Sequence, residues 1–562
     1  FFGAKVIYFP TLQPLIEDNI PVFIKNTFEP SAEGTCISNS TKLDNDEVVK
    51  GISHIENISI LNFEGSGMVG VPGFSKRFFE ALSSHQINVV MITQASSEFS
   101  ICIAINSDDA QLAKQVIDKE FEFEISQKRI NKSHIESNLA NIAIVGDKMK
   151  SKKGISGKLF SSLGNNNINV RAIAQGASER NISIIIDESN AKKALNALHE
   201  SFFEKDIKDI HIFITGVGNV GGYLIQQIKN QKDFISENLG LNLKVLGISN
   251  SKKMLISKKE IDLKNWSKLI DKSDTKADKD LFQKTIIELN RRNSLFVDNT
   301  ASEIIPLTYN NYLKNGIGII TCNKISNSST LSVYKELRRL SRLHNAAFFY
   351  ETNVGAALPV ISTLKNLINS GDKILKIEAV LSGTLNYIFN NFQKENTFHD
   401  IVSKAVDLGY TEPDPKIDLC GIDVCRKILI LARESGFNLE YDDVKKNHFL
   451  PNESINTDSK HEFILSLKNN KAHFNKILNE AKEKKCRLKF VAKLDNGNAS
   501  VGLEAVSSDH PFYNLVGSDN ITVFYTERYK DSPLVVKGAG AGGEFTASGV
   551  FADIIKASQE NG

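Results

Sequence analysis

The sequence predicts a multidomain protein that combines α/β and α+β domains with a tandem repeat of small β-α-β-β-α-β units. Three observations predict it: a strand-and-helix pattern that occurs twice before residue 208, an alternation of buried strands and helices from 209 to 350, and a mixture of helices and strands beyond 350. A chain of 562 residues is long enough for roughly three to five domains.

The composition argues against several classes of partner and compartment. A formal net charge of +2 without a long basic block argues against nucleic acid as a partner. No apolar run reaches the roughly 18 residues that a membrane-spanning helix needs, so we expect no membrane partner. Six cysteines are scattered without CxxC pairs, which favours a reduced, cytoplasmic protein. The first residues already follow a helix-then-strand pattern, so we expect a fragment of a longer protein and leave a plastid location open.

The repeat is visible as two similar strand pairs, INVVMITQASSEFSICIAI at 87–105 and INVRAIAQGASERNISIII at 168–186. Gln94 aligns with Gln175. Each copy follows a glycine-containing segment with an apolar-periodic helix, and each precedes a second helix. The repeat therefore predicts two split β-α-β units, at 54–125 and 136–206, which bury each other better than one copy alone.

A glycine motif, GVGNVG, stands between an apolar strand and a helix at 216–221. Gly216 permits a tight turn, Gly218 leaves room for a pyrophosphate, and Gly221 lets the helix pack closely on the strand. This context predicts a Rossmann-type nucleotide-binding domain at 209–350. A glycine turn without a nucleotide remains the alternative.

The end of the next strand bears on the choice of cofactor. An acid normally stands there to hold the ribose hydroxyls of NAD, but this chain has Ser249, Asn250, Ser251, Lys252 and Lys253. Small hydroxyls and lysines suit a 2′-phosphate, which favours NADP(H) and leaves NAD(H) possible. The alternative is that these are exposed loop residues without a ligand.

Two further positions follow buried strands. Lys324 comes just past one strand, at the edge where ligands of α/β domains bind, although a solvated lysine is an equal alternative. Glu351 precedes the small-residue turn TNVGAALP. It could hold a monovalent cation together with carbonyl groups, but contact with a helix N-terminus is the interpretation that the residues alone favour.

The segment GYTEPDPKIDLCGIDVCRK at 409–427 is dense in acids. Carboxylates this close repel one another unless cations compensate them. Asp423 and Lys427 are four apart in an apolar helix, which places them on one face. Lys427 is a candidate general acid. The alternative is a surface Asp–Lys pair, which the strongly apolar helix makes less favourable.

Taken together, these motifs resemble the homoserine dehydrogenase family. GYTEPDP, the D-L-x-G-x-D-V-x-R-K run, LSGTLNYIFN, NVGAALP and GAGAGG match that family in order, over about residues 209–562. The repeat resembles the paired ACT modules of aspartokinases, and 1–45 resembles the tail of an aspartokinase catalytic domain. The chain thus resembles the C-terminal two-thirds of a bifunctional aspartokinase–homoserine dehydrogenase. By itself it should lack kinase activity.

The resemblance implies reversible reduction of L-aspartate 4-semialdehyde to L-homoserine, in a catalytic and dimerisation domain at 351–536. Lys427 would protonate the carbonyl oxygen and Lys324 would lie near the same oxygen. Glu412 and Asp423 would hold the substrate ammonium with Asp418 beside them. The remaining pocket residues would be Tyr410, Gly383 and Thr384.

The resemblance also implies cofactor and metal contacts. The C-terminal glycine loop and helix, 537–562, would return to the nucleotide domain. The cofactor residues would be Gly216, Val217, Gly218, Asn219, Val220, Gly221, Ser249, Lys252, Thr300, Lys324 and Gly542. A sodium ion would lie in the loop of Glu351, Val354, Ala356 and Leu358. The chain departs from the family at Ile325, where a second lysine is usual, and at Cys322, where proline is common.

Regulation is implied by the ACT modules, in which Gln94 and Gln175 would contact threonine. The alternative is that these are strand-end amides satisfied by the backbone. We expect a homodimer or homotetramer. Two other functions stay open: an amino-acid-binding regulatory protein with an inactive dehydrogenase half, and a different amino-acid oxidoreductase. The intact Lys427, Glu412 and Asp423 argue against the first.

Overall fold

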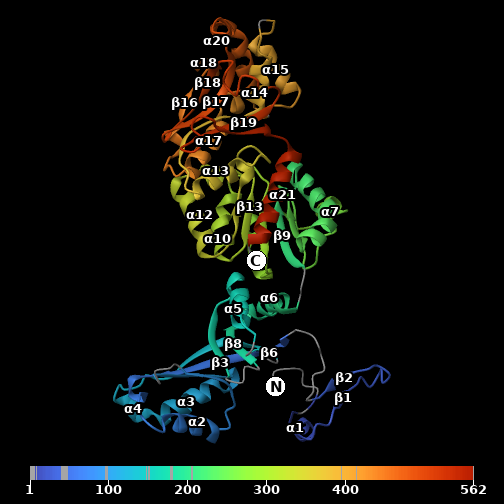
Figure 1. Ribbon diagram of the computed structural model, residues 1–562, viewed down its shortest axis with the longest axis vertical. Helices are drawn as coiled ribbons and strands as arrows, with labels where there is room; N and C mark the ends of the chain where they lie inside the picture. Colours follow the sequence, from blue (N-terminus) through green and yellow to red (C-terminus); the bar gives the residue numbers. More distant parts are fainter. Residues whose placement is uncertain are drawn as a thin grey trace. The chain divides into compact units, whose positions relative to one another are not determined.

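The computed structural model describes the chain apart from residues 1–6, 8, 39–47, 95–98, 147–148, 150–151, 177–180, 204–206, 394, 413 and 561–562. Two compact units divide it, Phe1–Lys205 and Asp206–Gly562 (Figure 1). The first unit begins with helix α1 (Phe9–Glu17) and a small antiparallel sheet of β1 (Val22–Ile24) and β2 (Thr35–Ile37). This start agrees with the expected helix-then-strand pattern.

The repeats form one six-stranded antiparallel sheet in the order β4-β5-β3-β6-β8-β7. Its strands are β3 (Val49–Glu64), β4 (Val89–Gln94), β5 (Ser100–Asn106), β6 (His134–Gly146), β7 (Val170–Gln175) and β8 (Asn181–Asp187). Its helices are α2 (Phe74–Ser84), α3 (Ala110–Glu120), α4 (Glu122–Ser126), α5 (Ile155–Asn165) and α6 (Ala191–Phe203).

The two long strands of this sheet serve both repeats. β3 pairs with β6 from Val49 opposite Gly146 to Asn62 opposite His134. The first repeat therefore ends with the start of β6. In the described residues the second repeat ends with α6, and the start of β3 completes its sheet. Separate apolar clusters lie under the helices of each repeat, and a third lies on the opposite face of the sheet.

The second unit starts with the predicted doubly wound domain. Its six-stranded sheet has the order β11-β10-β9-β12-β13-β14, parallel except for the edge strand β11. The strands are β9 (Lys208–Thr215), β10 (Leu241–Ser249), β11 (Met254–Ile256), β12 (Ser294–Asp298), β13 (Gly318–Thr321) and β14 (Phe348–Phe349). The strand order reverses between β9 and β12, at the edge where such sheets bind ligands.

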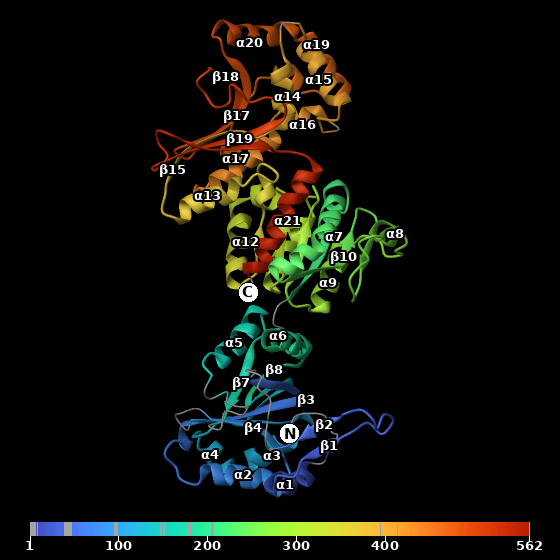
Figure 2. The ribbon, with the colours of Figure 1, turned by 45° about the vertical axis from the view of Figure 1, so that its right-hand side comes forward.

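Helices cover both faces of this sheet. One face carries α7 (Asn219–Leu239), α8 (Trp266–Asp271) and α21 (Gly543–Glu560), whose apolar side chains join the same cluster. The other face carries α9 (Lys279–Leu289), α10 (Tyr309–Lys314) and α12 (Leu331–Leu343), with the short α11 (Ile325–Ser328) before α12. Figure 2 shows α21 alongside α7, so the C-terminal helix does pack on the nucleotide domain.

The rest of the unit surrounds a third sheet, ordered β16-β18-β17-β15-β19-β20. Its strands are β15 (Ile374–Val380), β16 (Lys445–Asn447), β17 (Arg487–Asp495), β18 (Asn498–Val506), β19 (Asp519–Thr526) and β20 (Leu534–Ala539), antiparallel except for β16 beside β18. Its helices are α13 (Val360–Asn369), α14 (Gly383–Asn391), α15 (Phe398–Asp407), α16 (Pro415–Leu419), α17 (Ile422–Glu434), α18 (Asn452–Ile455), α19 (Lys460–Asn469) and α20 (Lys471–Glu483). The core of this domain is continuous with one face of the nucleotide sheet.

No helix in the described ranges is long and apolar enough to cross a membrane.

Candidate active site

The glycine turn after β9 is packed as the motif predicts. Gly216 has φ of 91°, and a Cβ there would lie 2.8 Å from the Asn299 backbone. A Cβ on Gly221 would lie 2.2 Å from the Gly216 carbonyl oxygen. At Gly218, by contrast, an added Cβ would meet nothing within 4 Å. The first and last glycines of the turn are therefore packed against protein atoms, whereas the middle one, Gly218, is open. Gly218 is also the N-cap of α7, so the open position lies at a helix N-terminus.

The end of β10 supports this turn through its backbone. The carbonyl oxygen of Ser249 accepts hydrogen bonds from Gly216 N at 2.8 Å and Val217 N at 3.3 Å. The Ser249 hydroxyl is buried and donates to the Asn250 carbonyl at 3.2 Å. Asn250 Oδ1 in turn accepts from the amides of Lys252 and Lys253. Ser249 thus shapes the glycine turn, while the exposed Lys252 remains available to a ligand.

The C-terminal helix begins beside the same turn. Gly542 has φ of 118°, a conformation that glycine adopts readily. A Cβ on Gly543 would lie 2.8 Å from the Asn219 side chain, and Gln227 Nε2 donates to Ser548 Oγ at 2.8 Å. The N-termini of α7 and α21 therefore meet near the open Gly218, and two helix N-termini favour an anion there.

A buried polar network holds the ends of β12 and β13, and sequence reasoning missed it. Tyr309 donates to Asp298 Oδ2 at 2.7 Å, and Asn323 Nδ2 donates to the same oxygen at 3.2 Å. Asp298 Oδ1 accepts from Thr300 N at 2.8 Å. Burial raises the pKa of Asp298 despite these donors. The network fixes Thr300, whose methyl also packs against Gly216, and the residues before Lys324. An acid at the end of a buried strand was the one sequence signal for it.

Lys324, Asp423 and Lys427 come together as one constellation. Asp423 Oδ2 lies 2.8 Å from Lys427 Nζ, and its Oδ1 lies 3.3 Å from Lys324 Nζ. Lys427 also donates to the Leu381 carbonyl at 2.7 Å. Lys324 follows β13 and precedes α11, whereas Asp423 and Lys427 lie on α17. The site thus joins a residue of the nucleotide domain to two residues of the second domain.

The two lysines have different environments. Burial lowers the pKa of Lys427, only partly offset by Asp423, while the neighbouring charge of Lys324 lowers it further. The charge of Asp423 raises the pKa of Lys324 above its ordinary value, against the effect of burial. Burial by itself would raise the pKa of Asp423, but the two lysines hold it well below its usual range. Lys427 is therefore the lysine that releases a proton more easily.

The acid-rich segment before α17 contains three of the predicted substrate residues, and Thr384 of α14 contacts it. Asp418 Oδ2 accepts from Glu412 N at 2.8 Å, and Thr384 Oγ1 donates to the Tyr410 carbonyl at 2.5 Å. Burial, together with the charges of Glu412 and Asp423, raises the pKa of Asp418 to about 6. An extra cation would relieve the repulsion among these acids. Gly383 starts α14, and a Cβ there would press on the Ser518 backbone at 3.0 Å.

Asn520 is a further residue that sequence reasoning missed. Its Nδ2 donates to the Leu381 carbonyl at 3.2 Å, the same oxygen that Lys427 contacts. Its Oδ1 is buried without a hydrogen-bond partner. A lone asparagine at the start of a strand gives no signal of this position in the sequence.

In the loop predicted to hold sodium, both carboxylate oxygens of Glu351 already accept hydrogen bonds from the protein. Glu351 Oε1 accepts from Ile361 N at 2.7 Å, and Oε2 accepts from Ser362 N at 2.9 Å. Both amides belong to the first turn of α13, so the carboxylate stabilises that helix N-terminus. Leu358 and Val354 lie in the same loop, and Ala356 has φ of 53°. The geometry favours the helix-contact interpretation of Glu351 over a carboxylate ligand.

Gln94 and Gln175 occupy the last positions of β4 and β7, and both are exposed. A cavity of about 500 Å³ on the repeat sheet includes Gln94, but Gln175 is not among the residues around it. The polar side chains that line this cavity also include Asn62, His134 and an ion pair of Arg171 and Glu136 at 3.2 Å. Among the described residues, the two predicted effector positions therefore differ in whether they line this cavity.

Comparison with protein families assigns most of the chain. Residues 359–555 match the model of homoserine dehydrogenase, and 216–351 match the homoserine dehydrogenase NAD-binding domain. Residues 61–121 and 142–202 each match an ACT domain model. The matched segments coincide with the repeat, the glycine-turn domain and the domain that carries Asp423 and Lys427.

Individual relatives give the same result. A bifunctional aspartokinase/homoserine dehydrogenase of Zea mays is 41% identical over 562 residues, 99% of this chain and 61% of the relative. A bifunctional relative from Haemophilus influenzae is 38% identical over all of this chain and 68% of its own length. A homoserine dehydrogenase of Schizosaccharomyces pombe is 39% identical over 62% of this chain and 95% of its own length. The chain thus spans about 61% of the length of the maize relative.

A solved structure also matches. The crystal structure of a Candida auris protein of unknown function has a TM-score of 0.59 and 34% identity, and covers 63% of this chain and 99% of its own.

Proposed function

Because the chain belongs to the homoserine dehydrogenase family and carries a pair of ACT domains, we propose that it reversibly reduces L-aspartate 4-semialdehyde to L-homoserine. The observation that carries the proposal is the bridge of Asp423 between Lys324 and Lys427. A dehydrogenase acting on an amino aldehyde needs a proton donor, a positive environment for the developing alkoxide and anionic groups for the ammonium. Lys324 and Lys427 can meet the first two needs, and the neighbouring Asp423 is an anionic group for the third.

Lys427 is the proton donor in this proposal. Its lowered pKa suits transfer of a proton to the carbonyl oxygen during reduction and recovery of the proton during homoserine oxidation. Lys324, whose pKa is raised, stays charged and stabilises the alkoxide electrostatically. Asp423 orients both ammonium groups.

The substrate ammonium would be held by Glu412 and Asp423, with Asp418 beside them. Glu412 is exposed, which leaves its carboxylate accessible to a substrate. Gly383, Thr384 and Tyr410 would form the rest of the pocket wall, where Tyr410 stacks on Tyr387 with ring centroids 4.4 Å apart.

The nicotinamide cofactor supplies or accepts the hydride when bound. The residues fit such a group: the open Gly218 is the N-cap of α7, with Val217, Asn219 and Val220 beside it. Thr300 and Gly542 would complete the contacts. We favour NADP(H) because the exposed Lys252 follows β10 where an acid would suit NAD(H).

Threonine is the proposed effector, acting through the ACT pair. Gln94 supports this better than Gln175, because in the part of the chain that the structure describes Gln94 lines the cavity with charged and amide side chains and Gln175 does not. If sodium binds the loop of Val354, Ala356 and Leu358, their carbonyls would supply most ligands, since both Glu351 oxygens already accept hydrogen bonds. A homodimer or homotetramer and a cytoplasmic or plastid location remain predictions.

The proposal is tested by homoserine-dependent reduction of NADP and of NAD, with and without threonine. We expect turnover with homoserine, a higher kcat/KM with NADP, and a change in rate with threonine. A folded chain that binds threonine but shows no turnover would favour the alternative of a regulatory protein with an inactive dehydrogenase half. Better turnover with other amino alcohols than with homoserine would favour a different oxidoreductase.

A further inference from the structure

The contact between Lys324 and Asp423 needs support from elsewhere in the fold. The side chains are 28% and 47% exposed, and partly exposed ion pairs contribute little to holding two elements together. Lys324 precedes α11 and Asp423 lies in the first turn of α17, so the contact depends on how these helices are fixed to each other. The structure provides a second connection at the far end of α17.

The last turn of α17 is fixed to the helices that follow Lys324. Its final residue, Glu434, lies about 16 Å along the helix axis from Asp423, at 1.5 Å per residue. Glu434 Oε1 accepts from the Tyr334 hydroxyl at 2.8 Å and from Arg338 Nη2. Tyr334 and Arg338 both belong to α12, which directly follows α11. The Glu434 side chain is only 5% exposed.

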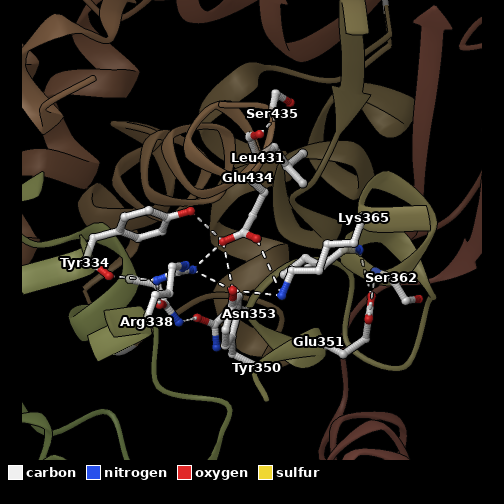
Figure 3. A network of polar contacts seen from close by, with 12 residues as sticks. Tyr334, Arg338, Tyr350, Glu351, Asn353, Ser362, Lys365, Leu431, Glu434 and Ser435 are labelled. Atoms are coloured by element: carbon white, nitrogen blue, oxygen red, sulfur yellow. Dashed lines mark hydrogen bonds and ion pairs between the residues drawn. The ribbon is translucent and has the colours of Figure 1, made fainter. Parts of the chain in front are cut away.

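Figure 3 shows the other groups directed at this carboxylate. The Tyr350 hydroxyl donates to Glu434 Oε1 at 2.9 Å and accepts from Arg338 Nη2 at 2.5 Å. Lys365 Nζ lies 3.5 Å from Glu434 Oε2 and donates to the Tyr350 hydroxyl at 2.9 Å. Two cations and two hydroxyls therefore surround one buried carboxylate. Loss of its charge would leave Arg338 and Lys365 uncompensated.

The neighbouring Arg433 extends the connection to α11 itself. Its Nη1 donates to the Asn327 carbonyl at 3.0 Å. The Asn327 side chain donates to Asn353 Oδ1 at 2.8 Å, and Asn353 donates to the Thr321 carbonyl at 3.0 Å. Thr321 ends the strand before Lys324, and Asn327 lies one helical turn after Lys324. The backbone is thus fixed on both sides of Lys324.

We propose that Glu434 and Arg338 are positioning residues, which set Lys324 against Asp423 and Lys427 by fixing the end of α17 to α11 and α12. This inference rests on the proposed dehydrogenase function. A displacement of about 1 Å at a reacting group can lower the rate by about 100-fold. The predicted effect of a Glu434 variant is therefore kinetic and acts through Lys324.

The test is a double-mutant cycle in the 562-residue chain. We expect Glu434→Gln to lower kcat/KM for homoserine by about 100-fold, with the KM for NADP changed by less than about 3-fold. In a Lys324→Met background the same change should lower kcat/KM by less than about 3-fold, because the positioned group is already absent. A merely structural role would give the same loss in both backgrounds.

Glu378→Gln is the matched control. Glu378 has a 4% exposed side chain that pairs with Lys376, Lys493 and His510. It lies on β15 on the same sheet face as Val380, which is buried in a cluster on the face opposite α17. We expect it to destabilise the chain as Glu434→Gln does while leaving kcat/KM within about 3-fold. Equal losses from both variants would overturn the proposal.

A milder variant covers the case in which Glu434→Gln does not fold. Tyr334→Phe removes one donor to Glu434 and no charge, and should lower kcat/KM by about 3-fold to 10-fold in the parent chain only. Persistence of that loss in the Lys324→Met background would contradict positioning through Lys324. An inactive parent chain would refute the proposed function instead, whereas an active parent with unaffected Glu434→Gln would refute this inference alone.

Discussion

Asp423→Asn tests the bridge at the centre of the candidate site. The substitution keeps the size of the side chain but removes the charge that lies 2.8 Å from Lys427 Nζ and 3.3 Å from Lys324 Nζ. The Asp423 side chain is 47% exposed but that of Lys427 is only 10% exposed, so the substitution leaves a largely buried cation without its partner and should lower stability as well as activity.

The magnitude of the effect on activity follows from the interactions that the substrate would lose. A hydrogen bond to a charged group contributes about 1.5–3 kcal/mol, which is about 10- to 150-fold at about 1.4 kcal/mol per factor of ten. The pKa of Lys324 should also fall, because the charge of Asp423 is the largest cause of its raised value. Together these effects predict a loss of kcat/KM of at least about 100-fold.

The assay is the initial rate of NADPH formation with homoserine across pH, beside thermal unfolding of the same samples. Asp414→Asn is the matched control, since Asp414 caps α16 through Lys416 N at 3.0 Å, and asparagine caps helices as well as aspartate does. We expect the control to keep both activity and melting temperature. Activity of Asp423→Asn within about 3-fold of the parent would refute the bridging role.

Four further outcomes follow from the site and the ACT pair. Because the pKa of Asp418 is raised to about 6, its carboxylate gains a proton as the pH falls through that value, so the KM for homoserine should rise below about pH 6. Asp418→Asn should remove this pH dependence, and a KM profile that the variant leaves unchanged would argue against a contact between Asp418 and the substrate ammonium. Gly218→Ala meets no protein atom within 4 Å, so it should keep the melting temperature yet raise the KM for NADP by about 10-fold or more, and an unaltered KM would place the pyrophosphate elsewhere. Lys252→Glu should lower kcat/KM for NADP relative to NAD by about 10-fold, which competing steady-state measurements with both cofactors would show or exclude. Gln94→Ala should weaken the response to threonine more than Gln175→Ala, and titrations with equal responses would contradict the difference that the cavity suggests.

Local spacing predicted the parts of the site that lie close together in the chain. Asp423 and Lys427, four apart on an apolar helix, do form an ion pair on one face of α17. The glycine motif likewise predicted the close packing at Gly216 and Gly221, because their roles depend on steric contact at one turn. Such features follow from helix and turn geometry alone.

Contacts between distant segments were not available from the sequence. Lys324 was placed at a strand end, but its contact with Asp423 depends on how two domains pack. Ser249 was predicted only as a cofactor contact, whereas its carbonyl also supports the glycine turn. The Glu351 carboxylate accepts hydrogen bonds from the first turn of α13, which is the contact that the residues alone favoured over a cation ligand. The network around Glu434 joins α17 to α12 and to Tyr350, and the hydrophobic periodicity of a helix does not show which other segments it contacts.

The shared strands of the repeat illustrate the same limit on the scale of the fold. Both copies were recognisable from 87–105 and 168–186. That β3 and β6 each serve both copies depends on strand length and register, which a repeat alignment does not define.

The most direct test of the account compares homoserine-dependent NADP reduction by the parent chain and by Lys427→Met. Lys427 is 8% exposed, and the Leu381 carbonyl that it contacts keeps its bond from Asn520 at 3.2 Å, so the variant should fold. Loss of the proton donor predicts a decrease in kcat of about 100- to 10,000-fold at an unchanged melting temperature. A folded variant that turns over homoserine at the parent rate would contradict Lys427 as the general acid.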